Sequence, residues 1–243
     1  MEDLILVTGM VINTIPVGEY DKRLTILTKE KGKIQAFARG AKRPNSSFSA
    51  AAAPFVFGKF YLRSGKSAYN LSKAEIKTYF EEISTDLDAV YYGSYFLELA
   101  DYYGVENQGA QKQLNLMYLS LKALLNEKFS NRLIRVIYEL KTLVINGEYP
   151  EVFKCCVCGK EDDLKYFSPA RGGAVCSSCG PVPGGILMEG SALYTLQYII
   201  SSDIDKLYTF EVKENVLHNL ELIMKDYFRF YIDRDFRSTV FLE

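Results

Sequence analysis

The chain has 243 residues, of which 48% are apolar and 24% charged, so its composition is globular and excludes a disordered or fibrous protein. No run approaches the roughly 18 consecutive apolar residues of a membrane span. The first residues, Met1-Glu2-Asp3-Leu4-Ile5, lack the basic segment of a secretion signal. We therefore expect a soluble, cytoplasmic protein with no membrane partner.

The net charge of −1 hides a strong asymmetry along the chain. Residues 1–80 contain 13 Lys and Arg against 6 Asp and Glu, which gives 13 − 6 = +7. Residues 81–243 contain 16 against 24, which gives 16 − 24 = −8. This division predicts a basic N-terminal module that could meet a polyanion, followed by an acidic body that would not.

Short β-like runs separated by turn residues fill the basic module. Because five short strands in about 75 residues fit a small barrel, we predict an OB-type fold over residues 1–80. The Arg63-Ser64-Gly65-Lys66 segment reads as a tight turn between the last two strands. The expected strands run from Leu4 to Asn13, Leu24 to Thr28, Lys33 to Arg39, Phe55 to Leu62 and Tyr69 to about Lys73.

The third of these runs alternates between a small apolar face and a face that carries cations around an aromatic ring. A basic loop with glycine and proline neighbours follows it. Cations with an interleaved aromatic on a small barrel are typical of single-strand binding, in which charges follow the phosphates and a ring stacks on a base. A solvated charged surface that deters strand pairing explains the same pattern. The candidate nucleic-acid residues are Arg39, Lys42 and Arg43, with Arg23, Lys31 and Lys33, and Phe37 as a stacking or barrel-packing ring.

The period changes after Ile83 to that of amphipathic helices. Thr85-Asp86-Leu87-Asp88 resembles a capping box before the first helix, which ends at Gly104. We predict a helical body in two parts, residues 81–150 and 187–243. The expected helices cover Ala89 to Tyr103, Leu114 to Leu125, Leu133 to Val144, Ser191 to Ser201 and Val216 to Tyr231.

Five cysteines interrupt the helical body within residues 151–186. Cys155-x-x-Cys158 and Cys176-x-x-Cys179 are separated by 17 residues, which is zinc-ribbon spacing. Two thiolates on each tight turn complete a tetrahedron around Zn²⁺, with Gly159 and Gly180 expected to relieve the backbone. Four sulfur ligands leave no open position, so the predicted Zn²⁺ is structural. Reduced cysteines that merely pack are the alternative, and Cys156 is expected to be a bystander.

The sequence lacks a recognisable catalytic constellation. Nucleobase deaminases also use a Cys-x-x-Cys pair, but Lys154 and Val175 stand where that signature wants proline. The only histidine, His218, lies far downstream of the cysteines. Gly65-Lys66-Ser67 lacks the earlier glycine of a phosphate-binding loop. We therefore expect a protein that is not an enzyme.

Several short motifs along the chain occur together in one known family. They are Gly18-Glu19-Tyr20-Asp21 and Leu24–Thr28, Ala38-Arg39-Gly40-Ala41-Lys42-Arg43, Ala74-Glu75 and Phe96-Leu97-Glu98-Leu99, the four spaced cysteines, and Phe236-Arg237-Ser238-x-x-Phe241-Leu242. On these motifs the whole chain resembles the bacterial recombination-mediator family RecO. The similarity implies an α+β multidomain fold with an N-terminal five-stranded OB-type β-barrel, then an α-helical domain with an inserted four-cysteine zinc ribbon. An alanine-rich stretch at Ser49–Ala53 departs from the expected pattern.

The resemblance also implies a function. Such proteins bind single- and double-stranded DNA, anneal complementary strands, engage the C-terminal tail of the single-stranded DNA-binding protein SSB, and work with RecR and RecF to load RecA. It implies a cytoplasmic, nucleoid-associated location. Arg132 and Arg135 are candidate SSB contacts because they flank apolar helix positions in the acidic half, although helix solubility also explains them. The alternative function is a zinc-ribbon RNA-binding adaptor of transcription or translation.

Overall fold

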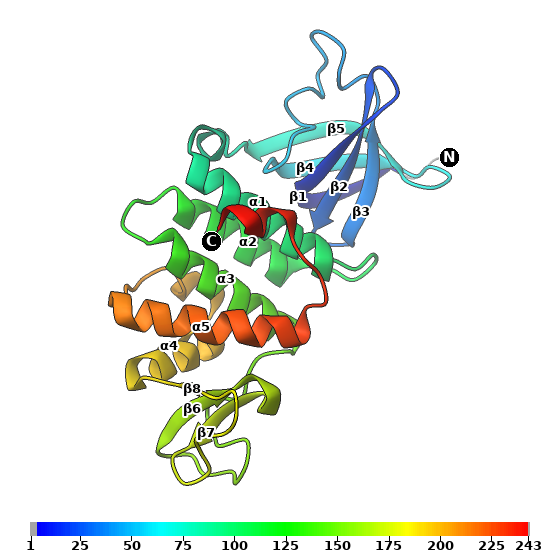
Figure 1. Cartoon of the computed structure of the whole chain (residues 1–243). Helices are drawn as coiled ribbons and strands as arrows, with labels where there is room; N and C mark the ends of the chain where they lie inside the picture. Colours follow the sequence, from blue (N-terminus) through cyan, green and yellow to red (C-terminus); the bar gives the residue numbers. More distant parts are fainter. Residues whose placement is uncertain (1–3, 243) are drawn as a thin grey trace. The chain divides into compact units, whose positions relative to one another are not determined.

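The computed structural model describes residues 4–242, which fold as two compact units (Figure 1). Among these residues, one unit comprises 4–121 with 236–242, and the other comprises Lys122–Asp235. These units do not follow the sequence-based boundaries at 80, 150 and 186. The first helix packs within the barrel unit, and the chain returns to that unit at its C-terminal end.

The first unit is built on a closed five-stranded barrel with the strand order β1-β2-β3-β5-β4 (Figure 1). All neighbouring pairs are antiparallel except β3 and β5, which are parallel. This is the connectivity of the predicted OB-type barrel, so the expected fold is confirmed. The strands are β1 (Leu4–Val17), β2 (Asp21–Thr28), β3 (Gly32–Ala38), β4 (Phe57–Arg63) and β5 (Tyr69–Thr78).

Successive side chains of each barrel strand point alternately inward and outward, so the apolar residues gather in the barrel interior. In β3, Ile34, Ala36 and Ala38 are buried, whereas the alternate residues are half-buried or exposed, as predicted. The alanine-rich stretch after the basic loop also enters the core, since Ala52 is fully buried beside the barrel side chains. Ala41 and Val56 of the same segment are also buried in this cluster. The segment from Arg39 to Val56 therefore contributes side chains to the barrel core.

A helical layer completes the first unit. It contains η1 (Glu81–Thr85), α1 (Leu87–Tyr103) and α2 (Gln111–Leu124), which continues into the second unit. The N-cap of α1 is Asp86, whose Oδ1 accepts a hydrogen bond from the amide of Ala89 at 3.0 Å. The expected capping box starting at Thr85 is therefore wrong by one residue, because the aspartate side chain reaches the free amide directly.

The C-terminal segment η4 (Arg237–Phe241) packs on α1. The hydroxyl of Ser238 donates to Oε2 of Glu98 at 2.7 Å, and its amide donates to the same oxygen at 3.2 Å. The rings of Tyr91 and Phe241 stack with centroids 4.5 Å apart. The Phe236-Arg237-Ser238 motif therefore has a structural role in joining the chain end to the barrel unit.

Three helices form the body of the second unit, α3 (Asn131–Asn146), α4 (Gly190–Ser201) and α5 (Glu214–Tyr231) (Figure 1). Their apolar stripes face one another, as the sequence periodicity indicates. Lys141 is buried among them, and its ammonium donates to the carbonyls of Ile199, Ile200 and Ser202 at the end of α4. Its positive charge suits a helix C-terminus.

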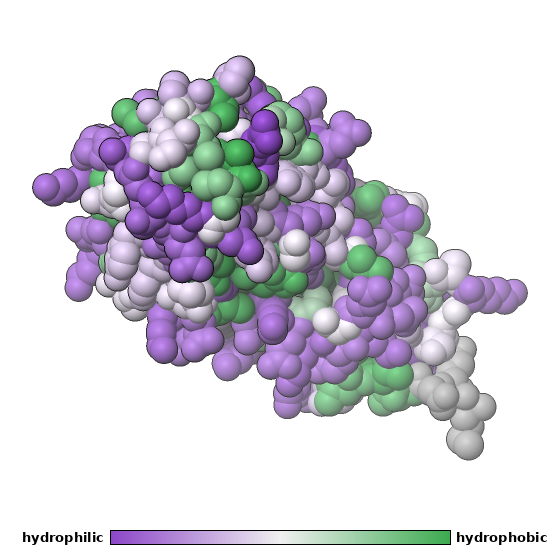
Figure 2. Space-filling view, turned by 90° about the horizontal axis from the view of Figure 1, so that it is seen from below, coloured by the Kyte–Doolittle hydropathy of each residue, from purple (hydrophilic) through white to green (hydrophobic). Residues whose placement is uncertain are grey.

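A small sheet, in the strand order β7-β6-β8, carries the cysteine segment between α3 and α4. Its strands are β6 (Leu164–Ser168), β7 (Gly173–Cys176) and β8 (Ile186–Leu187), with η2 (Pro169–Arg171) between the first two. The short η3 (Ile204–Lys206) follows α4. Within residues 4–242, no helix is long and apolar enough to cross a membrane. On the face seen in Figure 2, hydrophobic residues form only small patches among hydrophilic ones.

Candidate nucleic-acid interface and metal centre

A row of polar and aromatic side chains crosses the outer face of the barrel. Arg23 on β2 is in register with Phe37 on β3. Phe37 is in register with Asn70 on β5, and Asn70 with Arg63 on β4. Their sequence neighbours Leu24, Ala38 and Leu62 are buried, so this row faces away from the core. The barrel closure thus places one cation on each side of the aromatic ring, with Asn70 between Phe37 and Arg63.

The basic loop adjoins this row. Arg39 donates from Nε to Oδ1 of Asn70 at 3.2 Å. Asp21 accepts a hydrogen bond from the amide of Gly40 at 2.7 Å, and the amide of Lys42 donates to the carbonyl of Tyr20 at 2.8 Å. These bonds anchor the loop's backbone on the β1–β2 turn while the side chains of Arg39 and Lys42 remain exposed.

Arg43 lies over an aromatic ring at the same turn. Its guanidinium carbon is 5.0 Å from the ring centroid of Tyr20, which is the geometry of a cation–π contact. This contact keeps the charge of Arg43 and fixes its direction. The candidate interface therefore gathers Arg23, Phe37, Arg39, Lys42 and Arg43 at one end of β3.

Lys31 and Lys33 lie at the opposite end of β3, where Lys33 is about 20 Å from Arg39 along the strand. The ammonium of Lys33 donates to the carbonyl of Asp101 at 2.6 Å and is 3.3 Å from the carboxylate of the same residue. This contact attaches the barrel to α1. The structure therefore separates these two lysines from the other candidates and gives Lys33 a structural partner.

Sequence reasoning missed three residues of this interface, Tyr20, Arg63 and Asn70. The sequence analysis assigns Arg63 only to a turn. Its alignment with Phe37 arises from strand pairing across β3, β5 and β4. The parallel β3–β5 contact joins residues about thirty positions apart in sequence. No local pattern marks such a contact, although Tyr20 belongs to the Gly18-Glu19-Tyr20-Asp21 motif that contributes to the family resemblance.

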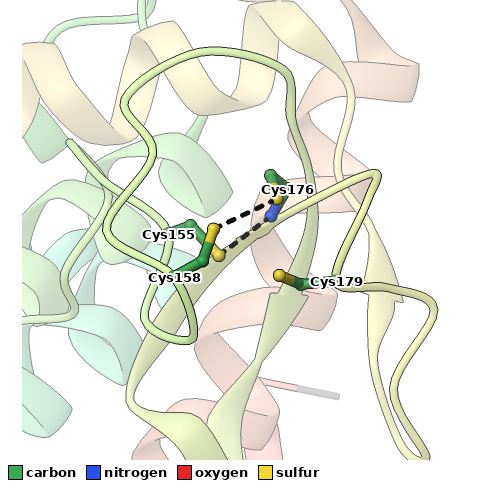
Figure 3. Close-up of side chains that lie close together, drawn as sticks. All are labelled: Cys155, Cys158, Cys176 and Cys179. Carbon is green, nitrogen blue, oxygen red and sulfur yellow. Dashed lines mark hydrogen bonds between the residues drawn. The ribbon is translucent and has the colours of Figure 1, made fainter.

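The four spaced cysteines converge on one point, with their sulfur atoms turned toward one another (Figure 3). All four Sγ atoms lie within 4.8 Å of one another, and those of Cys158 and Cys176 are 3.7 Å apart. A tetrahedral ion with Zn–S bonds of about 2.3 Å requires sulfurs roughly 3.8 Å apart. A disulfide requires about 2.05 Å. The sulfur positions therefore fit a tetrahedral metal ion and not a disulfide.

Each cysteine pair lies on a tight turn. The amide of Gly159 donates to the carbonyl of Cys155 at 2.9 Å, and Gly159 has a φ of +77°, which favours glycine. The second turn uses its glycine differently. A Cβ on Gly180 would lie 2.4 Å from the ring of Tyr166, so this glycine is needed for close packing and not for a left-handed backbone. The expectation that both glycines relieve backbone strain is thus right for Gly159 alone.

The sulfurs sit in contrasting electrostatic surroundings. Burial tends to raise the pKa of the Cys155 thiol, but hydrogen bonds from the backbone amides of Cys176, Cys158 and Val157 outweigh it and lower this pKa to about 6. Hydrogen bonds with the sulfurs of Cys158 and Cys176 raise the pKa of Cys179 to about 12. The amides thus stabilise a thiolate at the buried side of the cluster, which is the form of cysteine that binds a metal cation.

Cys156 lies outside the cluster. Its sulfur is 4.0 Å from the carbonyl of Glu151, and burial followed by the nearby Glu151 carboxylate raises its pKa. Cys156 is not among the four cysteines whose sulfurs converge. The position of Cys156 agrees with the bystander interpretation.

Arg132 and Arg135 are both engaged in ion pairs within the helical body. Arg132 donates from Nε to Glu221 at 2.8 Å, contacts the second oxygen of that carboxylate, and reaches Glu214 at 2.6 Å. These hydrogen bonds, led by Glu221, raise the pKa of Arg132. Arg135 donates to the buried Glu139 at 2.8 Å. Each guanidinium thus has a carboxylate partner within the helical body.

Comparisons with known proteins agree with this architecture. Residues 1–80 match the family model "Recombination protein O N terminal", and residues 84–239 match "Recombination protein O C terminal". The chain is 32% identical over 239 residues to DNA repair protein RecO of Acetivibrio thermocellus, covering 97% of this chain and 95% of the relative. It is 30% identical to DNA repair protein RecO of Thermoanaerobacter sp., covering 98% of this chain and 97% of the relative. It is 31% identical to DNA repair protein RecO of Bacillus subtilis, covering 97% of this chain and 92% of the relative.

Proposed function

Since the chain belongs to the recombination protein O family and therefore acts in DNA repair and recombination, we propose that its barrel binds single- and double-stranded DNA through the phosphate backbone. The observation that carries this proposal is the alignment of Arg23, Phe37 and Asn70 beside the anchored basic loop. Cations at that spacing can follow a strand without reading its bases.

The physical basis of binding is the release of counterions. Each phosphate that Arg39, Lys42 or Arg43 neutralises frees condensed cations into solution, so affinity falls as salt rises. Phe37 is half-buried in the same row and offers a ring face to an unpaired base. Single strands would then gain a stacking contribution that a duplex, whose bases are already stacked, cannot supply.

The family resemblance supports a non-enzymatic mediator role for the whole chain. In this role the protein anneals complementary strands, engages the C-terminal tail of SSB, and acts with RecR and RecF to load RecA in the cytoplasm at the nucleoid. Arg132 and Arg135 are the candidate tail contacts, and their ion pairs with Glu221 and Glu139 must open for a tail carboxylate to bind.

We assign Zn²⁺ as the ion of the four-cysteine cluster, held by Cys155, Cys158, Cys176 and Cys179. Four thiolates within reach of one centre are the donor set that zinc prefers in structural sites. The bound ion would fix the two cysteine turns to each other and to β7. Because all four positions are filled by sulfur, the site supports the fold and does not activate water.

An annealing assay tests the proposed function. The purified protein is mixed with complementary DNA strands, and duplex formation is followed by fluorescence quenching, with and without SSB covering the strands. We expect faster annealing of DNA in both cases. An RNA-binding adaptor would instead bind RNA more tightly than DNA and leave the annealing rate of DNA unchanged, and that result would overturn the proposal.

A further inference from the structure

A cavity of about 680 Å³ lies within the second unit, beside the helices α4 and α5, which pack against each other (Figure 1). It is lined by residues one turn apart on α4, by the segment Phe210–Lys213, and by the first turn of α5. We call this site the α4–α5 cavity. Its volume is large enough to hold a bulky side chain or a drug-sized molecule.

Aromatic rings form much of the cavity lining. The rings of Tyr198 and Phe210 meet edge to face, with their centroids 5.2 Å apart. The hydroxyl of Tyr198 donates to the carbonyl of Lys206 at 3.2 Å, which fixes the direction of the ring. A third lining ring, that of Tyr194, is 68% exposed. The cavity therefore suits a large apolar or aromatic side chain, which could pack against these rings.

The charge around the cavity is negative. Residues 187–215 contain two basic and five acidic side chains, which gives 2 − 5 = −3. Among the residues that line the cavity, Glu189 and Glu211 are opposed by Lys213, and all three are exposed. Oε2 of Glu189 accepts a hydrogen bond from Nδ2 of Asn215 at 2.8 Å, which leaves the carboxylate charged. A cationic partner would therefore meet complementary charge here.

Other charged groups nearby are paired within the unit. The carboxylate of Glu214 is 2.6 Å from the guanidinium of Arg132, and the ammonium of Lys206 is 3.8 Å from the carboxylate of Asp203. Glu211 has no ion pair with any residue that the structure describes. Its carboxylate is therefore available to a partner without the loss of an internal contact.

The segment Phe210–Lys213 also offers its backbone. It has an extended pattern, since Phe210 and Val212 are half-buried whereas Glu211 and Lys213 are exposed. Within residues 4–242, no backbone hydrogen bond joins the amide or carbonyl of Phe210, Glu211 or Val212 to another residue. An extended segment with free amides and carbonyls can pair with an added peptide strand, as the edge of a sheet does.

We propose that the α4–α5 cavity is a docking site for an extended basic segment of a partner protein, which pairs with Phe210–Lys213 and inserts one large apolar side chain. The cavity alone would accept a small molecule, but the free backbone beside it favours a peptide. Residues two positions apart in an extended peptide share a face. Cations two residues before and after the inserted side chain therefore lie on the same side of the peptide as that side chain, toward Glu189 and Glu211.

The test uses an end-capped synthetic peptide, Lys-Ser-Phe-Ser-Lys, and a control peptide with glutamate for both lysines. Binding is followed by amide chemical shifts of the isotope-labelled full chain, and we expect a dissociation constant of about 1 mM or tighter. Shifts confined to the residues that line the α4–α5 cavity and their neighbours are the expected result. No shifts, shifts elsewhere, or equal binding of the control peptide would overturn the proposal.

Methylated peptides test the backbone pairing. Successive amides of an extended peptide point to opposite edges, so methylation of the nitrogens at positions 2 and 4 blocks one edge, and methylation at positions 3 and 5 blocks the other. We expect one methylated peptide to bind as the parent does and the other to bind at least tenfold more weakly. If both bind as the parent does, the ligand fills the cavity without pairing, and the proposal of a strand-like partner is wrong.

Two substitutions test the cavity side chains. Glu211→Lys reverses an exposed charge and should weaken the peptide about tenfold, with Glu161→Lys as the matched control in the same unit. Tyr194→Ala should weaken it by a similar factor, with Phe230→Ala, another exposed ring of this unit, as the control. An affinity unchanged in both cavity variants contradicts the proposal. The peptide titration contains no DNA, so this proposal and the proposed DNA binding can fail independently.

Discussion

Arg39 at the end of β3 donates from Nε to Oδ1 of Asn70 on β5, across 3.2 Å. This contact links the basic loop to the row that contains Phe37, since Asn70 and Phe37 are in register. Asn70 thus directs a guanidinium that would otherwise move freely in solvent. The side chain of Asn70 is itself uncharged, so it does not neutralise a phosphate.

The first prediction concerns this positioning. Asn70→Ala should weaken single-stranded DNA binding by a few-fold, on the scale of about 1 kcal/mol for one hydrogen bond. The slope of log affinity against log salt should not change, because every cation remains. Ser72→Ala on the same strand is the control. If the salt slope instead changed by the amount expected for one lost phosphate contact, Asn70 would act in another way.

Phe37→Ala tests base stacking. Loss of a stacked base should weaken single-stranded DNA binding by about 1–3 kcal/mol and leave duplex binding nearly constant. Phe37→Tyr keeps a ring and should bind as the parent does. Fluorescence anisotropy with both DNA forms gives the comparison. If Phe37→Ala lowers only the free energy of unfolding, the ring is a packing residue of the barrel.

Cys158→Ser tests the metal centre. Zinc binding contributes on the order of 10 kcal/mol in small zinc modules, so this change should lower the metal content and unfold the ribbon locally. Protons compete with the metal for thiolates, so zinc affinity should fall as pH falls. Elemental analysis and a chelator titration across pH measure both effects, and Cys156→Ser is the control. Full metal content in Cys158→Ser would refute the four-sulfur site.

Glu221→Gln distinguishes the two roles of Arg132. Arg132 and Glu221 are partly exposed, so losing their ion pair should cost about 1 kcal/mol or less of unfolding free energy. If Arg132 binds the SSB tail, removing its competitor should strengthen binding of a tail peptide, and Arg132→Ala should weaken it. Titration of both variants decides the matter. If Glu221→Gln, Arg132→Ala and Arg135→Ala all bind the tail peptide with the parent affinity, neither arginine belongs to the tail site.

The local parts of the fold could be predicted because short-range patterns encode them. Alternation placed Ile34 inside and Phe37 outside, and helical periodicity located α3 and α5. Element ends were less accurate. The strand β1 continues four residues beyond Asn13, because it pairs with β4 from Leu4 to Met10 and with β2 from Gly9 to Val17. That exchange of partners leaves no mark in the hydrophobic pattern.

The two candidate sites also differ in how far the sequence could predict them. The cysteine cluster was predictable because its ligands come in two local pairs whose spacing carries the geometry. The cationic row was predictable only in part, since Arg63 and Asn70 reach it through pairing across three strands. The ion pairs of Arg132 could not be foreseen, because Glu214 and Glu221 lie more than eighty residues away on another helix.

The most direct test of the account is the salt dependence of single-stranded DNA binding by the triple variant Arg39→Ala, Lys42→Ala, Arg43→Ala. Three lost phosphate contacts should flatten the slope of log affinity against log salt by about two units and weaken all sequences alike. The control triple variant Lys112→Ala, Lys122→Ala, Lys128→Ala removes equal charge outside the barrel and should keep the parent slope. A folded barrel variant that binds DNA with the parent slope would contradict the assignment of DNA to this surface.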